Sequence, residues 1–180
     1  MAAAVRLTFP DAWEKAERIQ GWLGRGEAKL LYDLCDGPWC EIGSWKGRST
    51  TVLANTGYRG YAVDHFKGSP EHPESTDTYE EFVWNVGGYR NVTVLPFKFR
   101  AAAPFVPDGL RLLFLDADHS YEQTKLAFDL YESKLAPFGH VVFHDARGDG
   151  WPGVERVVAE MPWAHAATVE QSIAFQKPKS

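Results

Sequence analysis

The residues best suited to chemistry are four acidic side chains. Each lies at or beside the end of a segment whose pattern predicts a β-strand. They are Glu41, Asp64, Asp116 and Asp145. In a parallel sheet the carboxyl ends of the strands share one edge, so we expect the four carboxylates to meet in one cleft. Converging carboxylates destabilise a fold unless a cation lies among them. The pattern therefore predicts a cationic ligand, a divalent metal ion, or both.

A glycine-containing turn follows the first of these acids and predicts a nucleoside-type ligand. Gly43 ends a short strand, Gly47 precedes a helix that opens near Ser49, and Asp64 closes the next strand. In a doubly wound sheet, such a second-strand carboxylate accepts hydrogen bonds from ribose hydroxyls. We expect Gly43 to permit the turn and Gly47 to let a ligand approach the backbone. An ordinary strand-to-helix turn with a solvated aspartate is the alternative.

The glycine spacing argues against a dinucleotide or a nucleoside triphosphate. A dinucleotide fingerprint reads G-x-G-x-x-G, and a phosphate-binding P-loop ends in G-K-[ST]. Here Ser44 and Trp45 occupy the place of the second glycine, and no lysine follows Gly47. The acid before the turn, Glu41, suits a cationic ligand without phosphate. S-adenosylmethionine, which carries an ammonium and a sulfonium group, therefore fits better than NAD.

The elements that must position these residues alternate between short apolar runs and helical patterns, as in an α/β fold. Strands are expected at 39–42, 60–64, 92–95, 112–115, 140–143, 164–169 and 172–176, with the last two antiparallel. Helices are expected at 11–22 behind an Asp11 N-cap, at 27–35, at 49–56, at 78–86 behind a Thr78-x-x-Glu81 capping box, at 120–135 behind Ser120, and at 154–161. The polar segment 65–74 is either a lid or a mobile surface loop.

Length and composition predict one domain over residues 1–180, with a helical cap at 1–36 and an α/β core at 37–180. A net charge of −5 without any basic run argues against nucleic-acid or anionic-membrane binding. No apolar run is long enough for a membrane span or a signal peptide. Cys35 and Cys40 are expected to be buried thiols, so a cytoplasmic location is expected.

Several of these motifs resemble class I S-adenosylmethionine-dependent methyltransferases. The resemblance covers about residues 37–147 and rests on Glu41-Ile42-Gly43-x-x-x-Gly47-x-Ser49-Thr50, Val63-Asp64, Thr78-Tyr79-Glu80-Glu81-Phe82, Leu115-Asp116-Ala117-Asp118-His119-Ser120-Tyr121-Glu122 and Phe143-His144-Asp145. It is greatest to a small bacterial branch of macrolide- and aminocoumarin-sugar O-methyltransferases, with catechol and caffeoyl-CoA O-methyltransferases as cousins. It implies a Rossmann-like fold with helices on both faces of a seven-stranded, mainly parallel sheet, ordered 3-2-1-4-5-7-6 with strand 7 antiparallel.

The resemblance also implies roles for individual residues. Glu41 and Gly43 would face the methionine part of the cofactor, and Asp64 would bind the ribose. The full set expected to bind the cofactor is Glu41, Gly43, Ser44, Gly47, Ser49, Asp64 and Asp116.

Metal binding and catalysis are implied for three further positions. Asp116 and Asp145 match positions that ligate magnesium in metal-dependent relatives. His119 stands where the catechol and caffeoyl-CoA enzymes carry a lysine near the acceptor, so it is the candidate general base, with Asp116 as its catalytic partner. His144 is either a metal ligand or a residue that orients Asp145, and the second reading is favoured.

Two departures from the pattern leave questions open. Ala146 stands where the caffeoyl-CoA enzymes place an asparagine ligand, which leaves the requirement for magnesium open. The segment Phe97-Lys98-Phe99-Arg100 replaces a small or acidic segment near the adenine, so adenine recognition could instead use stacking on an aromatic ring.

We therefore expect methyl transfer from S-adenosylmethionine to an oxygen of a small hydroxylated metabolite by in-line displacement. The expected partner is a small-molecule substrate, with no nucleic acid and no membrane, while a homo-oligomer is left open. One alternative is a non-catalytic domain that keeps the cofactor pocket, which the altered Phe97–Arg100 segment would favour. The other is an NAD-dependent oxidoreductase, against which the missing G-x-G-x-x-G argues.

Overall fold

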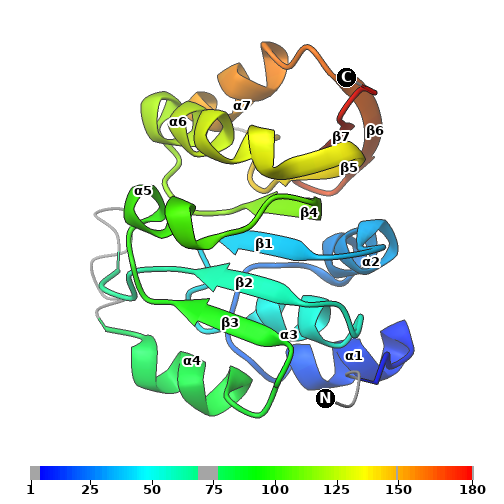
Figure 1. The fold of residues 1–180 in the computed structure, drawn as a ribbon, viewed down its shortest axis with the longest axis vertical. Helices are drawn as coiled ribbons and strands as arrows, with labels where there is room; N and C mark the ends of the chain where they lie inside the picture. Colours follow the sequence, from blue (N-terminus) through cyan, green and yellow to red (C-terminus); the bar gives the residue numbers. More distant parts are fainter. Residues whose placement is uncertain (1–4, 69–76, 149, 180) are drawn as a thin grey trace.

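A computed structural model describes residues 5–68, 77–148 and 150–179, and a twisted sheet runs through the middle of the molecule (Figure 1). Its seven strands have the order β3-β2-β1-β4-β5-β7-β6. Strands β1 to β5 pair in parallel, and β7 runs antiparallel to both of its neighbours. The predicted strand order and the antiparallel strand are confirmed. The strands are β1 (Trp39–Ile42), β2 (Gly60–Val63), β3 (Val92–Leu95), β4 (Leu110–Leu115), β5 (Leu135–Phe143), β6 (Ala164–Val169) and β7 (Ser172–Gln176).

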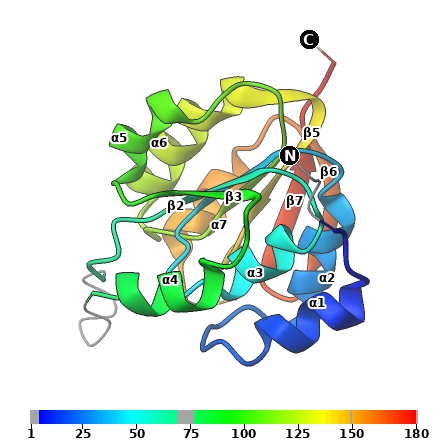
Figure 2. The same ribbon diagram turned by 60° about the horizontal axis from the view of Figure 1, so that its bottom comes forward.

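Helices cover both faces of this sheet (Figure 2). One face carries α1 (Phe9–Ala16), α2 (Arg25–Leu34), α3 (Arg48–Ala54) and α4 (Tyr79–Val86), and the other carries α5 (Phe99–Ala102), α6 (Tyr121–Tyr131) and α7 (Pro152–Ala159). Two short 3₁₀ turns, η1 (Ala103–Phe105) and η2 (Glu132–Lys134), follow α5 and α6. No helix in the described part of the chain is both long and apolar enough to span a membrane.

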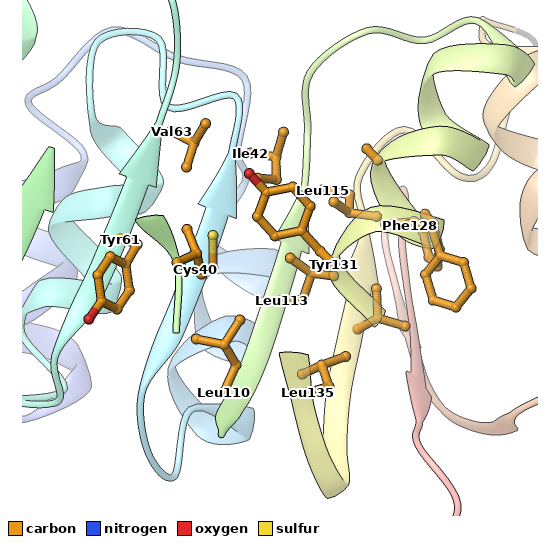
Figure 3. Close-up of a cluster of buried hydrophobic side chains, with 14 of the residues drawn as sticks. Cys40, Ile42, Tyr61, Val63, Leu110, Leu113, Leu115, Phe128, Tyr131 and Leu135 are labelled. Carbon is orange, nitrogen blue, oxygen red and sulfur yellow. The ribbon is translucent and has the colours of Figure 1, made fainter. Parts of the chain in front are cut away.

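Because helices lie on both sides, the central strands are buried on both faces and read as continuous apolar runs. Figure 3 shows the larger core, in which Cys40 and Ile42 of β1 and Leu113 and Leu115 of β4 lie with Tyr131 of α6. Both cysteines are buried free thiols, as the sequence predicted. Burial raises the pKa of the Cys35 thiol to about 11, so it is protonated at neutral pH.

The strand register places the functional residues on one face of the sheet. Glu41 pairs with Ala62 of β2 and with Phe114 of β4, and Phe114 pairs with Val142 of β5. Successive side chains of a strand alternate between faces, so residues two positions further along each strand stay on the same face. Glu41, Asp64, Asp116 and His144 thus belong to the face covered by α1 to α4.

The first helix differs from the prediction at both ends. Its N-cap is Thr8, whose side chain accepts a hydrogen bond from the backbone of Asp11, so the predicted Asp11 cap was wrong. The helix ends at Ala16 because Arg48 of α3 binds the carbonyl oxygens of Glu17, Ile19 and Leu23. A helix continued to Trp22 would have used the first of these oxygens for its own hydrogen bonds.

Two further predictions on element ends were wrong. Thr78 precedes α4 with φ −95° and ψ 6°, so its hydroxyl does not cap the helix, and Asp77 accepts the hydrogen bond from the Tyr79 amide instead. Strand β5 begins at Leu135 rather than at residue 140, and Phe138, at φ 62°, lies within it. Most of the predicted lid or mobile loop, 69–74, lies outside the described residues.

Gly43 provides a test of this packing. Its φ is 92°, and a Cβ built there would lie 1.8 Å from the carbonyl oxygen of Asp116. Gly109 has a φ of 89° but no atom within 4 Å of the same position. We expect Gly109→Ala to cost only the left-handed strain, about 1–2 kcal/mol, and Gly43→Ala to cost about 1–3 kcal/mol more through overpacking. Urea unfolding of the two variants measures the difference, and equal losses would contradict the described contact.

Candidate active site

The turn after β1 is held by the carboxylate at the end of β2. Asp64 Oδ2 accepts hydrogen bonds from the backbone amides of Ser44 (3.0 Å) and Trp45 (2.7 Å), and its Oδ1 accepts one from Phe66 (2.7 Å). Trp45 and Phe66 both have positive φ, at 43° and 58°. The carboxylate therefore faces the glycine turn, and its Oδ1 keeps a lone pair for a further donor.

The two glycines of the turn are required by protein packing. Gly43 lets the backbone of Asp116 and Ala117 cross directly over the end of β1. A Cβ at Gly47 would lie 2.5 Å from the side chain of Val86 in α4. The expectation that Gly47 leaves room for a ligand is thus corrected, because a helix occupies that space.

Glu41 is fully buried beneath this turn. Its Oε2 accepts a hydrogen bond from the Thr50 hydroxyl of α3. Within the described residues, no hydrogen bond reaches its Oε1 or the neighbouring Ser44 hydroxyl. Burial raises the pKa of Glu41 to about 7, against the opposing effect of the Ser49, Thr50 and Ser44 hydroxyls, which lie close enough to stabilise its carboxylate. A buried acceptor and a buried hydroxyl that both lack partners mark a place suited to a donor from a ligand.

A second group of acids surrounds the buried imidazole of His144 at the ends of β4 and β5. Its Nδ1 lies 3.1 Å from Asp116 Oδ1 and 3.1 Å from Asp145 Oδ2. Its Nε2 lies 3.4 Å from Oε2 of Glu27, which comes from α2. Only 4% of the His144 side chain and 3% of the Glu27 side chain are exposed, whereas Asp116 is 24% and Asp145 16% exposed, so the group is open to solvent on the aspartate side.

Charge controls protonation in this group. Burial alone would lower the pKa of His144, but the carboxylates of Asp116, Asp145 and Glu27 outweigh burial and hold it well above its usual value. Burial opposes ionisation of Asp145 and Glu27 as well, yet hydrogen bonds from the neighbouring histidines lower both of their pKa values. Three carboxylates around one imidazolium leave an excess of negative charge that favours a further cation.

Glu27 was not predicted from the sequence, in which its helix reads only as a cover for the sheet. The Gly24-x-x-Glu27 spacing does indicate a carboxylate at the third position of a helix, and the Gly24 amide does donate to Glu27 Oε2 at 3.0 Å. Nothing in the spacing indicates the contact with His144, which lies 117 residues further along the chain.

His119 contacts the same carboxylate oxygen of Asp145 as His144 does. Its Nε2 is 3.1 Å from Asp145 Oδ2, and its ring stacks on the indole of Trp151 with 4.0 Å between centroids. A Cβ on Gly153 would lie 2.5 Å from the His119 carbonyl oxygen, so the start of α7 closes over this residue. The side chain is 10% exposed, which makes the ring largely enclosed but still accessible.

The residues around His144 have the composition and spacing of a metal site. One ligand atom each from Asp116, His144 and Asp145 lies within 4.8 Å of the others. Adjacent ligands of an octahedral ion at about 2.1 Å lie about 3.0 Å apart. The two 3.1 Å separations from Nδ1 therefore suit either direct hydrogen bonds or coordination of one ion.

A small pocket of about 20 Å³ adjoins these residues. Its lining includes Ile42, Phe99, Asp116, His119 and Thr124. Phe99, from the segment that departs from the resembled family, therefore contributes an aromatic ring to the pocket. Phe97 instead stacks on Phe105, with 5.9 Å between ring centroids, on the surface.

Residues 40–146 match the family described as "Methyltransferase domain". The chain belongs to this methyltransferase family. The matched stretch runs from β1 past the end of β5 and includes Glu41, Asp64, Asp116, His119 and Asp145. The alternative of an NAD-dependent oxidoreductase is thereby set aside.

Individual relatives of this methyltransferase are distant. The uncharacterized protein R132 of Acanthamoeba polyphaga mimivirus is 33% identical over 61 residues, which are 31% of this chain and 28% of that protein. The O-methyltransferase NovP superposes with a TM-score of 0.70 at 17% identity, covering 87% of this chain and 81% of its own. TomG from Streptomyces achromogenes, an O-methyltransferase involved in tomaymycin synthesis and solved with S-adenosylmethionine, gives a TM-score of 0.62 at 16% identity, covering 94% and 89%.

At these identities the solved structures establish the fold, and the family match establishes the activity class. The seven-stranded sheet of order 3-2-1-4-5-7-6 is that of the Rossmann-like methyltransferases. The chain is thus a member of a methyltransferase family and has the class I methyltransferase fold.

The raised pKa of Glu41 predicts how stability depends on pH. The folded state holds this proton up to about pH 7, whereas a glutamate with its ordinary pKa loses it near pH 4.5. The folded state thus binds more protons between these values, and the free energy of unfolding falls as pH rises through this window. Glu41→Gln should abolish that slope. Its free energy of unfolding should exceed that of the wild type by about 3 kcal/mol at pH 8, with little difference at pH 4.

Urea unfolding between pH 4 and pH 8 measures this effect. Glu14→Gln, which changes a carboxylate that is 64% exposed, is the control and should leave the slope unchanged. A wild-type free energy of unfolding that is flat or rising between pH 5 and pH 7, with the same profile in Glu41→Gln, would contradict a buried carboxyl of raised pKa.

Proposed function

We propose that this methyltransferase moves the methyl group of S-adenosylmethionine to a hydroxyl oxygen of a small metabolite, at the carboxyl edge of β1, β2, β4 and β5. The observation that carries the proposal is the meeting of Glu41, Asp64 and Asp116 around one glycine turn, with Glu41 Oε1 and the Ser44 hydroxyl buried without described partners. An ammonium group donates three hydrogen bonds and carries positive charge, so it suits such acceptors.

In this proposal the cofactor lies across the glycine turn. Glu41 and Ser44 receive the methionyl ammonium, and Asp64 uses the remaining lone pair of Oδ1 for the ribose. Gly43 lets the backbone of Asp116 pass close to the turn, so that Asp116 would lie beside the methionine part of the cofactor. Ser49 acts through Glu41, whose carboxylate its hydroxyl stabilises, and Gly47 acts by seating α4 behind the turn.

The adenine would lie beside Phe99, where the pocket of about 20 Å³ would have to widen to admit the base. Ile42 and Leu115 supply apolar lining from the ends of β1 and β4, and Phe99 supplies a ring on which a base can stack. Such an arrangement would replace the small or acidic segment of the resembled family. It needs no charged contact to the adenine.

Asp116, His144 and Asp145 would hold a divalent ion if one binds. Carboxylate ligands suit magnesium, whereas an imidazole ligand favours manganese, iron or zinc. When bound, such an ion supplies electrostatic stabilisation of a deprotonated acceptor oxygen. Because Ala146 stands where the resembled enzymes place an asparagine ligand, His144 would be the third ligand, and we favour a transition metal over magnesium.

His119 is the proposed general base. Asp145 would hold Nε2 and stabilise the imidazolium that forms when the other ring nitrogen takes the hydroxyl proton. Stacking on Trp151 fixes the ring plane and excludes water from one side. The remaining contribution of the protein is alignment of the acceptor oxygen with the methyl carbon at about 3–3.5 Å.

An oxygen acceptor is supported by two similar proteins, NovP and TomG, which are named as O-methyltransferases. Incubation with S-adenosylmethionine carrying a ¹³C methyl group and a panel of phenols and sugar alcohols, read by mass spectrometry, tests it. We expect a methyl ether. Tight binding of S-adenosylhomocysteine without turnover of any acceptor in the panel would favour the non-catalytic alternative, and an N-methylated product would overturn the choice of oxygen.

Cofactor binding should depend on Asp64. Asp64→Asn replaces one carboxylate oxygen by an NH₂ group, which cannot accept from the backbone amides or from the ribose. We expect its affinity for S-adenosylhomocysteine, measured by calorimetry, to fall at least about tenfold, for about 1.4 kcal/mol of lost binding. Asp36→Asn makes the same change where the chain enters β1, at the opposite edge of the sheet, and should bind normally. Equal affinities in the two variants would rule out the ribose role.

Turnover should depend on His119 while cofactor binding does not. His119→Gln removes the base but keeps a polar side chain beside Asp145. General-base catalysis contributes about 10²–10⁴-fold, so we expect a loss of that size in single-turnover rate at pH 7. The dissociation constant of S-adenosylhomocysteine should change less than about threefold, because in this proposal His119 faces the acceptor. A wild-type single-turnover rate would reassign the base.

A further inference from the structure

Glu27 lies outside the stretch that matches the methyltransferase family, yet it reaches the centre of the candidate site. Its Oε2 accepts from the Gly24 amide at 3.0 Å, and its Oε1 accepts from the Ser172 hydroxyl at 2.8 Å. With only 3% of the side chain exposed, its contact with His144 Nε2 at 3.4 Å is shielded from water. The helical cap thus contributes a buried carboxylate to the ends of β4 and β5.

The donors around Glu27 require Nε2 of His144 to carry a proton. A carboxylate that already accepts an amide and a hydroxyl has only acceptor capacity left, so Nε2 must donate to it. With Nε2–H directed at Glu27, the geometry of the ring turns Nδ1 toward Asp116 and Asp145.

We propose that Glu27 is a positioning residue, which fixes the ring and the Nε2–H of His144 so that Nδ1 faces the Asp116–Asp145 pair. The inference rests on the proposed function only in that both use the same site. Carboxylates and carbonyls that orient a histidine in this way change metal affinity or activity by about 10–100-fold when they are removed. Glu27 acts through His144 and touches neither the proposed cofactor site nor His119.

A purely structural role for Glu27 is the competing explanation. Its bonds to Gly24 and Ser172 join α2 to the start of β7, and that joint alone could account for a buried carboxylate. Ser172→Ala removes one of these bonds without touching His144, so it is the matched control. The two roles predict different effects on the imidazole.

The test compares the ¹⁵N signals of the His144 ring in the resting protein at pH 7, assigned by their loss in His144→Gln. In the wild type and in Ser172→Ala, we expect the signal of a protonated Nε2. In Glu27→Asp, whose shorter carboxylate withdraws from the ring, and in Glu27→Met, we expect that signal to shift or to exchange. Glu27→Gln keeps an acceptor oxygen and should restore the wild-type pattern.

Kinetics supply the second readout. We expect kcat to fall about 10–100-fold in Glu27→Met and about tenfold in Glu27→Asp, with the KM for S-adenosylmethionine nearly unchanged. Wild-type ¹⁵N signals in Glu27→Asp, or equal ¹⁵N changes in Ser172→Ala, would overturn the proposal. The ¹⁵N readout needs no acceptor substrate, so it decides the role of Glu27 even if the proposed methyl transfer to oxygen fails. If Glu27→Met does not fold, Glu27→Asp decides the role of Glu27.

Discussion

The site depends on one buried imidazole that lies among three carboxylates from separate parts of the chain. Asp116 and Asp145 contact Nδ1 of His144, and Glu27 contacts Nε2. Removing the imidazolium would leave these carboxylates without compensation, which is costly in a protein interior. The arrangement therefore joins the ends of β4 and β5 to α2, and its excess negative charge prepares the same edge for a cation.

Parallel pairing explains why the other acids meet there. In-register strands β1, β2, β4 and β5 end at one edge, and the two-residue alternation puts Glu41, Asp64, Asp116 and His144 on the same face. Asp64 then serves both the fold and the proposed ligand, since it holds the glycine turn through two amides. The turn that would receive the methyl donor is thus shaped by the residue that would bind the ribose.

The sequence predicted those features that follow from local pattern and parallel topology. Apolar runs that end in acids were sufficient to predict the convergence of Glu41, Asp64 and Asp116, whereas the strand order was predicted from the resemblance to class I methyltransferases. It did not predict features set by distant contacts. Arg48 binds carbonyl oxygens of the segment that follows the first helix, and the packing of α4 against the turn requires a glycine at position 47. For the same reason the sequence did not indicate the role of Glu27, which depends on a partner more than a hundred residues away in the chain.

The central claim is that the carboxyl edge of β1, β2 and β4 binds the methyl donor. Backbone amide NMR during titration with S-adenosylhomocysteine tests it most directly. The account predicts that the amides of Ser44, Trp45 and Phe66, which bind Asp64, shift most. Unmoved signals there at saturation, with the largest shifts around Asp36 and Arg111 at the opposite edge, would contradict it.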